Sequence, residues 1–406
     1  MSTEQSWRPV RIGDLIRESR IKGSNGSSAK KLTIRLYGRG IVASSDRGGS
    51  EATNYFRRKA GQFAYSKLDC LNGAFGIVPE HLDGYETTLD LPAFDFLGKV
   101  DPDWFLKMVS RPAFYGRFKF AAIGSRKANR VPTVEFLATR LSIPPLAEQR
   151  AIAEVLGAVD NAIAKTEASI EAITQTLNKT VSWVLENAKS VAVPTVSFGE
   201  VIESTKYGTS AKCDDNPSGF PVLRIPNVLS HGVDQGHLKY ADLPPDEAKK
   251  FELRDGDLLA VRTNGNPEYV GRMALIKDLP RGTLYASYLI RIRVDQKKVL
   301  PEFVWLSSET FPLRDSLTAA ATTSAGNFNI NSDGLKSARL PLPSMDVQKE
   351  VVAAAEILRL RRSREQEYLE QLRDTSTALA QELLSGRLRL PESMIGRHRD
   401  QPERAA

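Results

Sequence analysis

A ten-residue pattern that occurs twice constrains this chain more than any other feature. Residues 141–150 are LSIPPLAEQR, and residues 340–349, which lie 199 positions later, are LPLPSMDVQK. In each copy a strand-like stretch ends at a proline-rich turn, and the residues after the turn have the apolar spacing of a helix. Because a strand, a turn and a helix recur together, the chain is expected to contain two copies of one structural unit.

The repeat continues upstream of this junction. Residues 61–67 (GQFAYSK) match residues 256–262 (GDLLAVR) at a shift of 195 positions, and the same shift places Phe75-Gly76 against Val270-Gly271. The shift differs from that of the junction, so the copies differ by insertions as well as by substitutions. The two copies are therefore expected to share a backbone fold and to differ in the side chains that it carries.

Length and composition favour a globular protein with two domains. A chain of 406 residues suits two domains of about 140 residues plus helices, and 41% hydrophobic and 26% charged residues are ordinary globular values. No apolar run approaches the roughly 20 residues that cross a bilayer, and residues 1–5 lack the apolar core of a signal peptide. Cys70 and Cys213 are isolated, which favours a reducing compartment. We therefore expect a cytoplasmic protein.

The positive charge is concentrated in the first copy. The whole chain carries a net charge of +7, whereas residues 1–142 alone contain 23 Lys and Arg against 14 Asp and Glu. A basic first copy is compatible with a polyanionic partner such as nucleic acid.

Each junction opens a long helix with a heptad seam. Apolar residues recur in steps of four and three, which is typical of a helix that packs against one partner helix. The expected length of roughly 35–40 residues corresponds to a rod of about 50–60 Å. The pattern favours an antiparallel coiled coil between the two helices; the alternative is that each helix packs only on its own domain. The seam positions are Ile152, Leu156, Val159, Ile163, Thr166, Ile170, Ile173, Leu177, Thr180 and Val184 in the first helix, and Val351, Ala355, Leu358, Arg362, Glu365, Leu369, Leu372, Ser376, Leu379 and Leu383 in the second.

The regions between the helices indicate an α+β fold. Residues 220–225, 258–261 and 289–294 are strand-like, whereas residues 102–109 and 301–307 are typical of short helices. The predicted fold class is therefore α+β, with two strand-rich domains, two long helices and an internal pseudo-two-fold repeat. The predicted segments are a first domain (1–142), a spacer helix (143–190), a second domain (191–340), a second spacer helix (341–386) and a disordered tail (387–406).

Polar loops of both copies carry candidate nucleic-acid contacts. Arg and Lys side chains can bind guanine or phosphate, and Asn can pair with adenine through two hydrogen bonds. For any single loop, the alternative is an ordinary solvated turn. The candidate residues are Lys67, Asn72, Arg126, Lys127, Lys212, Arg262, Asn264 and Asn266.

Each stretch of the sequence that is similar to a catalytic motif is better explained by ordinary local structure. Residues 266–269 (NPEY) are similar to the Asn-Pro-Pro-Tyr motif of amino-methyltransferases, but the third position differs and no glycine-rich cofactor loop precedes it, which favours a tight turn. Glu247 and Lys249 have the spacing of half a metal-nuclease site, but no separate upstream carboxylate accompanies them. The four histidines are scattered, and the chain is expected to be non-catalytic.

The junctions carry a resemblance to a known family. Residues 143–153 (IPPLAEQRAIA) resemble the signature of the specificity subunits of type I restriction–modification enzymes. Residues 61–79 are similar to one class of their target-recognition domain, and residues 256–262 (GDLLAVR) with 327–331 (NFNIN) are similar to another. The second junction departs from the signature, with Ser344 for the second proline and Val347 in place of the glutamate. The resemblance covers nearly the whole chain.

This resemblance implies a DNA-binding subunit that has no cofactor of its own. Two modification subunits would methylate adenine with S-adenosylmethionine, and restriction subunits would use ATP and Mg²⁺. The junction residues Glu148, Gln149, Arg150, Gln348 and Lys349 would contact these partners. Two unlike copies on a rigid rod would read two half-sites about one helical turn apart. The alternative is a protein-interaction scaffold with no DNA contact.

Overall fold

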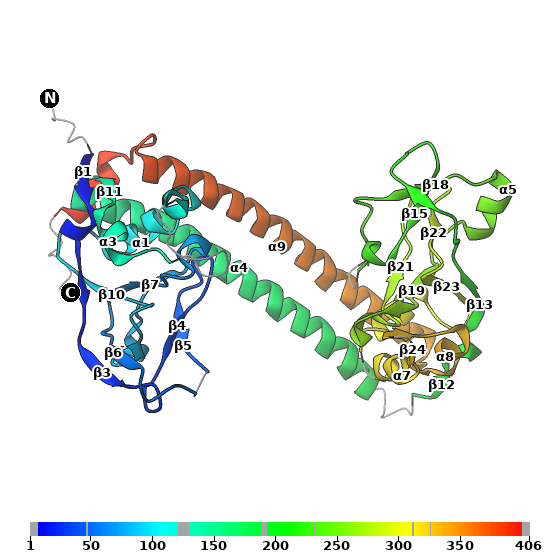
Figure 1. The fold of residues 1–406 in the computed structure, drawn as a ribbon. Helices are drawn as coiled ribbons and strands as arrows, with labels where there is room; N and C mark the ends of the chain where they lie inside the picture. Colours follow the sequence, from blue (N-terminus) through cyan, green and yellow to red (C-terminus); the bar gives the residue numbers. More distant parts are fainter. Residues whose placement is uncertain are drawn as a thin grey trace. The chain divides into compact units, whose positions relative to one another are not determined.

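The computed structural model describes residues 7–45, 48–120, 130–187, 193–229, 232–310, 312–324 and 326–399. The chain forms two compact units: unit 1 contains Met1–Lys165 and Glu370–Ala406, and unit 2 contains Thr166–Leu369. Both units mix helices and strands, as predicted (Figure 1). Each unit also includes a part of both long helices, and these parts bury side chains in its core.

Unit 1 is built around a four-stranded antiparallel sheet in the order β2-β10-β7-β8. Smaller sheets pair β1 with β11, β4 with β5, and β3 with β6 and β9. The bounds are β1 Arg8–Arg11, β2 Ile16–Ser19, β3 Lys22–Asn25, β4 Leu32–Ile34, β5 Ile41–Ala43, β6 Asn54–Arg57, β7 Phe63–Tyr65, β8 Phe75–Ile77, β9 Glu86–Thr87, β10 Ala93–Phe96, α1 Pro102–Val109, α2 Pro112–Tyr115, α3 Thr133–Ala138 and β11 Arg140–Ile143.

Unit 2 contains a four-stranded antiparallel sheet in the order β13-β23-β19-β21, and a second sheet in the order β14-β18-β15-β22. Smaller sheets join β12 with β26, β16 with β17, and β20 with β25 and β24. The bounds are β12 Thr195–Ser197, β13 Ile202–Tyr207, β14 Cys213–Asp214, β15 Phe220–Leu223, β16 Val228–Leu229, β17 Gly232–Val233, β18 Lys239–Ala241, α5 Pro245–Ala248, β19 Leu258–Val261, β20 Thr263–Asn264, β21 Met273–Leu275, β22 Leu284–Tyr285, β23 Leu289–Val294, α6 Pro301–Ser307, α7 Leu313–Ala319, β24 Thr322–Ser324, β25 Asn327–Asn329, α8 Ser332–Ser337 and β26 Arg339–Pro341.

The main sheets of the two units share one strand order and one register. Phe63 on β7 lies opposite Phe94 on β10, and Leu258 on β19 lies opposite Ile292 on β23. Both central strands follow a glycine with positive φ, at residues 61 and 256. The predicted match of residues 61–67 with 256–262 is therefore confirmed by register.

The predicted match of Gly76 with Gly271 is wrong. In unit 1 Tyr65 pairs with Phe75, and at the matching position in unit 2 Ala260 pairs with Met273. This register places Gly73, not Gly76, against Gly271, and both of these glycines have a left-handed φ, of 68° and 74°. A constant shift of 195 positions gave the wrong match because unit 2 has three additional residues in this hairpin.

The cores of the two units differ in their side chains. In unit 1, Phe63, Tyr65, Phe75, Phe94 and Phe136 form a stacked aromatic cluster. In unit 2 the corresponding strands contribute mainly Leu, Ile, Val and Met. The same frame is therefore filled by different side chains, as apolar cores permit when the volume is kept.

The long helices are α4 (Leu146–Asn187) and α9 (Met345–Ser385), which have 42 and 41 residues. In unit 1, Ile152 and Leu156 of α4 belong to the same core as Leu383 of α9. In unit 2, Leu177 of α4 belongs to the same core as Val351 of α9. Every predicted seam residue whose side chain the structure describes is buried or half-buried. The side chain of Val184 is not among those described. The four-three spacing thus identified the inner face of both helices.

The prediction of a disordered tail is wrong for residues 387–399. After Gly386, whose φ of 75° ends α9, the chain forms α10 (Glu392–Ile395) and a 3-10 turn, Gly396–His398. Low apolar content suggested disorder, but the tail is held by polar contacts with the first turns of α4. Residues 400–406 lie outside the described residues.

Candidate nucleic-acid interface

The two junction glutamines make equivalent hydrogen bonds in the two units. The Gln149 Oε1 accepts from the Asp101 backbone N–H at 2.8 Å, and its Nε2 donates to a carbonyl of the proline turn at 2.8 Å. The Gln348 side chain accepts from the Leu300 N–H at 2.9 Å and donates to its own proline turn at 2.9 Å. Both side chains are at most 1% exposed. Their predicted contact with partner subunits is therefore corrected: these glutamines join the junction to the short helix beside it.

The other junction residues differ in accessibility. Glu148 is 2% exposed, and both of its carboxylate oxygens accept hydrogen bonds from the Arg389 guanidinium, at 2.6 and 2.8 Å. Arg150 is 8% exposed and contacts the His398 carbonyl at 3.5 Å. Both are engaged inside unit 1, which argues against direct partner contact. Lys349 has 63% of its side chain exposed and remains a candidate.

Arg262 stands at the end of the central strand of unit 2 on a fixed backbone. Its N–H donates to the Tyr288 carbonyl at 2.9 Å, and its carbonyl accepts from the Ile330 N–H at 2.9 Å. Its guanidinium lies over the Tyr207 ring at 4.8 Å from the centroid, a cation–π geometry. The half-buried arginine is therefore held in place by both its backbone and its side chain.

Asn264 and Asn266 shape the loop that follows Arg262. The Asn264 Oδ1 accepts from the Asn266 N–H at 2.9 Å, and the Asn266 Oδ1 accepts from the Glu268 N–H at 3.0 Å. Pairing with adenine needs both the oxygen and the nitrogen of the amide. Because each oxygen already has a partner, adenine recognition would use its second lone pair or require the turn to rearrange.

Several tyrosines extend this surface, and the sequence analysis missed them. Tyr207, Tyr269 and Tyr288 are 37%, 40% and 59% exposed, and the Arg272 guanidinium lies 4.1 Å from the Tyr269 ring centroid. We call Tyr207, Arg262, Tyr269, Arg272 and Tyr288 the aromatic–arginine surface. Interleaved arginines and exposed aromatic rings are typical of nucleic-acid interfaces, because rings and guanidinium groups stack on bases.

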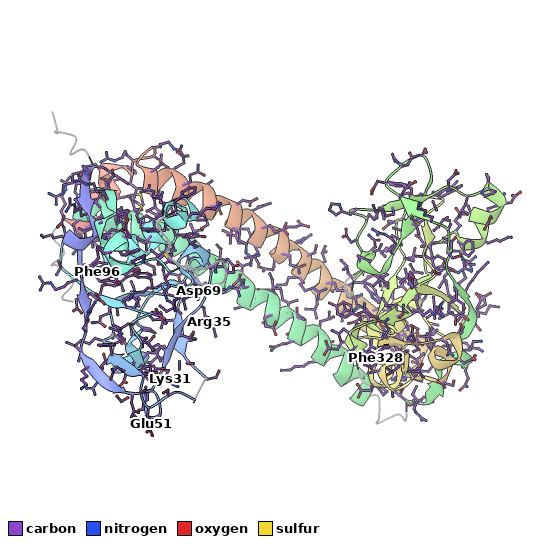
Figure 2. All side chains as sticks on the ribbon, in the orientation of Figure 1. Lys31, Arg35, Glu51, Asp69, Phe96 and Phe328 are labelled. Carbon is purple, nitrogen blue, oxygen red and sulfur yellow. The ribbon has the colours of Figure 1, made fainter. Side chains whose placement is uncertain are left out.

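The neighbouring strands place two further residues relative to this surface. β20 pairs with β25, where Phe328 lies opposite Asn264, and Figure 2 labels this phenylalanine within unit 2. Lys212 is exposed in the segment between β13 and β14, five residues after Tyr207. No single strand motif in the sequence indicated that these segments meet, because their pairing is long-range.

In unit 1, Lys67 occupies the position that Arg262 occupies in unit 2. Its N–H donates to the Asp90 carbonyl at 2.8 Å, and its carbonyl accepts from the Val131 N–H at 2.9 Å. The backbone N–H and the carbonyl of Lys67 thus make the same two hydrogen bonds as those of Arg262, so the predicted equivalence of Lys67 and Arg262 is confirmed.

Asn72 closes a 3-10 turn, Cys70–Asn72, close to Lys67. It is exposed, and its carbonyl accepts from the Tyr37 N–H at 2.9 Å, which brings the β4–β5 loop beside this turn. Figure 2 draws Arg35 of that loop and Asp69 along the same edge of unit 1. Arg126 and Lys127 lie outside the described residues.

The rejected catalytic motifs have ordinary structural roles. Residues 267–269 form a 3-10 turn capped by Asn266, and Lys249 forms an exposed ion pair with Asp246 at 3.3 Å. Burial raises the pKa of the Cys70 thiol to about 12, which disfavours a reactive thiolate. Among the described residues, no three His, Cys, Asp or Glu side chains gather as metal ligands, and no helix there is long and apolar enough to span a membrane.

Comparisons with known proteins show which proteins this chain is similar to. No protein-family model matches the chain. It is 30% identical over 245 residues to the type I restriction enzyme EcoKI specificity subunit of Escherichia coli K12, covering 57% of this chain and 53% of that protein. It is 26% identical over 286 residues to the StySPI specificity subunit of Salmonella potsdam, covering 65% of this chain and 61% of the relative. The chain thus spans about half to three fifths of the length of these relatives.

Solved structures share the fold at low sequence identity. The S subunit of a type I restriction–modification system from M. genitalium superposes with a TM-score of 0.59 at 13% identity, over 94% of this chain and 97% of that one. A chain from a structural study of complex assembly in the type I system superposes with a TM-score of 0.53 at 13% identity, over 96% and 100%. The sequence relatives named above are specificity subunits of type I restriction enzymes, and the chain is similar to them in sequence and shares the fold of the S subunit.

Proposed function

We propose that the protein is the non-catalytic, sequence-reading subunit of a type I restriction–modification complex. The observation that carries the proposal is the equivalence of Lys67 and Arg262, which share one backbone hydrogen-bond pattern but differ in side chain. A fixed frame that presents a different side chain in each unit suits the recognition of two different DNA half-sites. Residues 1–142 and 191–340 would be the two target-recognition domains.

The long helices would set the distance between the half-sites. Buried seams on the inner faces of α4 and α9 support an antiparallel coiled coil formed by segments 143–190 and 341–386. Half-sites on one face of DNA lie about 34–36 Å apart, which is within the reach of helices of 42 and 41 residues at about 1.5 Å per residue.

The chemistry would belong to partner subunits. Two modification subunits would methylate adenine with S-adenosylmethionine, and restriction subunits would supply ATP- and Mg²⁺-dependent cleavage, while this chain carries no cofactor. The exposed Lys349 is the junction residue best placed to contact such a partner. A cytoplasmic location follows from this role.

A binding experiment tests the proposal against the protein-scaffold alternative. The full chain, assembled with its modification subunits, is titrated against duplexes that contain or lack the motif methylated in the source genome, across a salt series. Tight binding to the motif duplex, weakening linearly in log salt, is the expected result. Equal affinity for both duplexes would refute sequence recognition, and no DNA binding by an intact complex would favour the scaffold.

A further inference from the structure

A strongly basic groove lies in unit 2, at the end of β19 opposite Arg262. It has a volume of about 720 Å³, is open to solvent, and is lined by cationic side chains from the segments before β19, after β21 and along β23. Only Glu252 and Asp255 among its lining residues are acidic. We call this site the basic groove and define it by Lys249, Lys250, Arg254, Arg281, Arg291 and Arg293.

Part of this positive charge is neutralised inside the unit. Arg293 donates to both carboxylate oxygens of Asp257, at 2.6 and 3.0 Å. The Glu252 Oε1 accepts from the Gly282 backbone N–H at 3.0 Å. Two charges of the groove are therefore committed to internal structure.

Lys249 and Arg254 also have acidic partners, Asp246 at 3.3 Å and Asp257 at 3.9 Å, whereas the other groove cations have none among the described residues. Within the part of the chain that the structure describes, Lys250, Arg281 and Arg291 form no ion pair. Arg291 is 7% exposed, donates one hydrogen bond to the Glu252 carbonyl at 3.2 Å, and has a buried Nε without an acceptor. The exposed groove cations without an ion pair are therefore Lys250 and Arg281, and an incoming anion can reach these two side chains.

The shared frame does not require these arginines. By register, Arg291 and Arg293 of β23 occupy the positions of Ala93 and Asp95 of β10. In unit 1 that aspartate accepts a hydrogen bond from Gln62 Nε2 at 2.7 Å. The same two positions therefore carry an alanine and an aspartate in unit 1 and two arginines in unit 2, so unit 1 lacks these two cations of the groove.

We propose that the basic groove binds the phosphodiester backbone of DNA beyond the bases that unit 2 reads, an inference that rests on the proposed function. Guanidinium groups fit phosphate oxygens through paired hydrogen bonds, and an open groove admits a continuing strand. The four residues of β19 separate the groove from Arg262 by about 13 Å, which equals about four base-pair steps of 3.4 Å. The contact strengthens binding without adding sequence information.

The test removes two exposed groove cations and leaves the buried ones in place. The double variant Lys250→Ala/Arg281→Ala is assembled with the modification subunits and titrated against a motif duplex with long flanks, across a salt series. The control Lys336→Ala/Arg339→Ala removes the same charge from exposed positions elsewhere in unit 2. Because each phosphate contact contributes about 0.9 to the salt slope, the groove variant is expected to lose about two units of slope and the control none.

Shortening the duplex separates this contact from others. When the flank on the unit 2 side ends directly after the motif, wild type and groove variant should bind alike, and both should keep the same sequence preference. A wild-type slope in the groove variant, or a difference that persists on the short duplex, would overturn the proposal while leaving sequence recognition intact. Failure of the wild-type complex to bind any duplex would overturn both.

A third arm distinguishes DNA from a small phosphate ligand. If inorganic phosphate stabilises the wild type but not the groove variant against heat, while the DNA salt slope is the same for both, the groove holds a free anion and the DNA proposal is wrong. Equal thermal response to phosphate together with the expected loss of slope supports the DNA contact.

Discussion

The ion pair between Glu148 and Arg389 makes a sharp test of how the tail stabilises unit 1. The carboxylate is 2% exposed and binds the guanidinium through two hydrogen bonds, of 2.6 and 2.8 Å. Arg389→Ala removes both bonds and leaves a buried negative charge without its partner. The variant is therefore expected to lose stability through the carboxylate that remains, rather than through the arginine that is lost.

The size of the loss follows from the burial of the two partners. Removing one member of a fully buried pair costs about 3–5 kcal/mol. Because the Arg389 side chain is 42% exposed, water can reach the vacated position, and the expected cost falls to about 2–3 kcal/mol. For a unit of this size, each kcal/mol corresponds to a shift of roughly 2–4 °C in the melting temperature.

The second junction indicates which second substitution should compensate for the loss of Arg389. Val347 occupies the position of Glu148, so the frame accepts an apolar side chain there. Glu148→Val/Arg389→Ala removes the unpaired charge and is expected to recover most of the stability. The control Arg387→Ala breaks an exposed pair with Glu382 and should cost about 0.5 kcal/mol or less.

Urea and thermal unfolding followed by circular dichroism measure these differences in the isolated chain. An Arg389→Ala variant within about 0.5 kcal/mol of wild type would refute the reasoning, because the buried carboxylate would then tolerate the loss of its partner. A double variant no more stable than Arg389→Ala would refute it as well, since the penalty would not come from the charge.

Four further outcomes can be measured. Gln348→Ala should destabilise unit 2 by about 1–3 kcal/mol in urea, because buried backbone groups lose their partners. Replacing residues 1–142 with those of a relative should change one half-site in a methylation map and leave the other unchanged. Inserting four residues near Asn178 lengthens α4 by about 6 Å and should change the spacer between half-sites by one or two base pairs. Arg262→Ala should cost about 1–3 kcal/mol at one base position if the arginine reads guanine, or lower the salt slope by about one if it holds a phosphate.

Features set by local spacing were predictable from the sequence. The seam of each long helix follows from a four-three rhythm, and the register of β7 and β19 follows from a glycine turn before an apolar strand. Tyr207, Tyr269 and Tyr288 could not be found in the same way. Tyr207 and Tyr288 come from separate segments and meet Arg262 only through long-range contacts, whereas Tyr269 contacts Arg272 three positions later in a turn that has no strand or helix periodicity.

The tail and the junction glutamines show a second limit of sequence reasoning. Charged residues are typical of exposed surfaces, yet Glu148 is buried because Arg389, 241 positions later, neutralises it. Gln149 and Gln348 are junction residues, for which the family resemblance implied contact with partner subunits. Their role as buried links depends on backbone groups of α1 and α6, which the sequence does not bring together.

Two kinds of position can be distinguished when the units are compared. Gln149 and Gln348 satisfy backbone groups, and backbone groups are present in both units whatever their side chains, so glutamine occurs in both. Positions whose partner is another side chain can change when both members change together. Asp95 pairs with Gln62 in unit 1, whereas Arg293 pairs with Asp257 at the same place in unit 2.

The long helices follow the same rule. Asp160 of α4 forms an ion pair with Lys107 of α1, and 199 positions later Arg359 of α9 lies over the Trp305 ring of α6, 3.5 Å from its centroid. Burial lowers the pKa of Arg359 to about 10, and its Nε has no acceptor among the described residues. Charge at a frame position can thus reverse without a change in the backbone that holds it. A duplicated frame with this freedom can acquire two different recognition surfaces while each unit keeps the same fold.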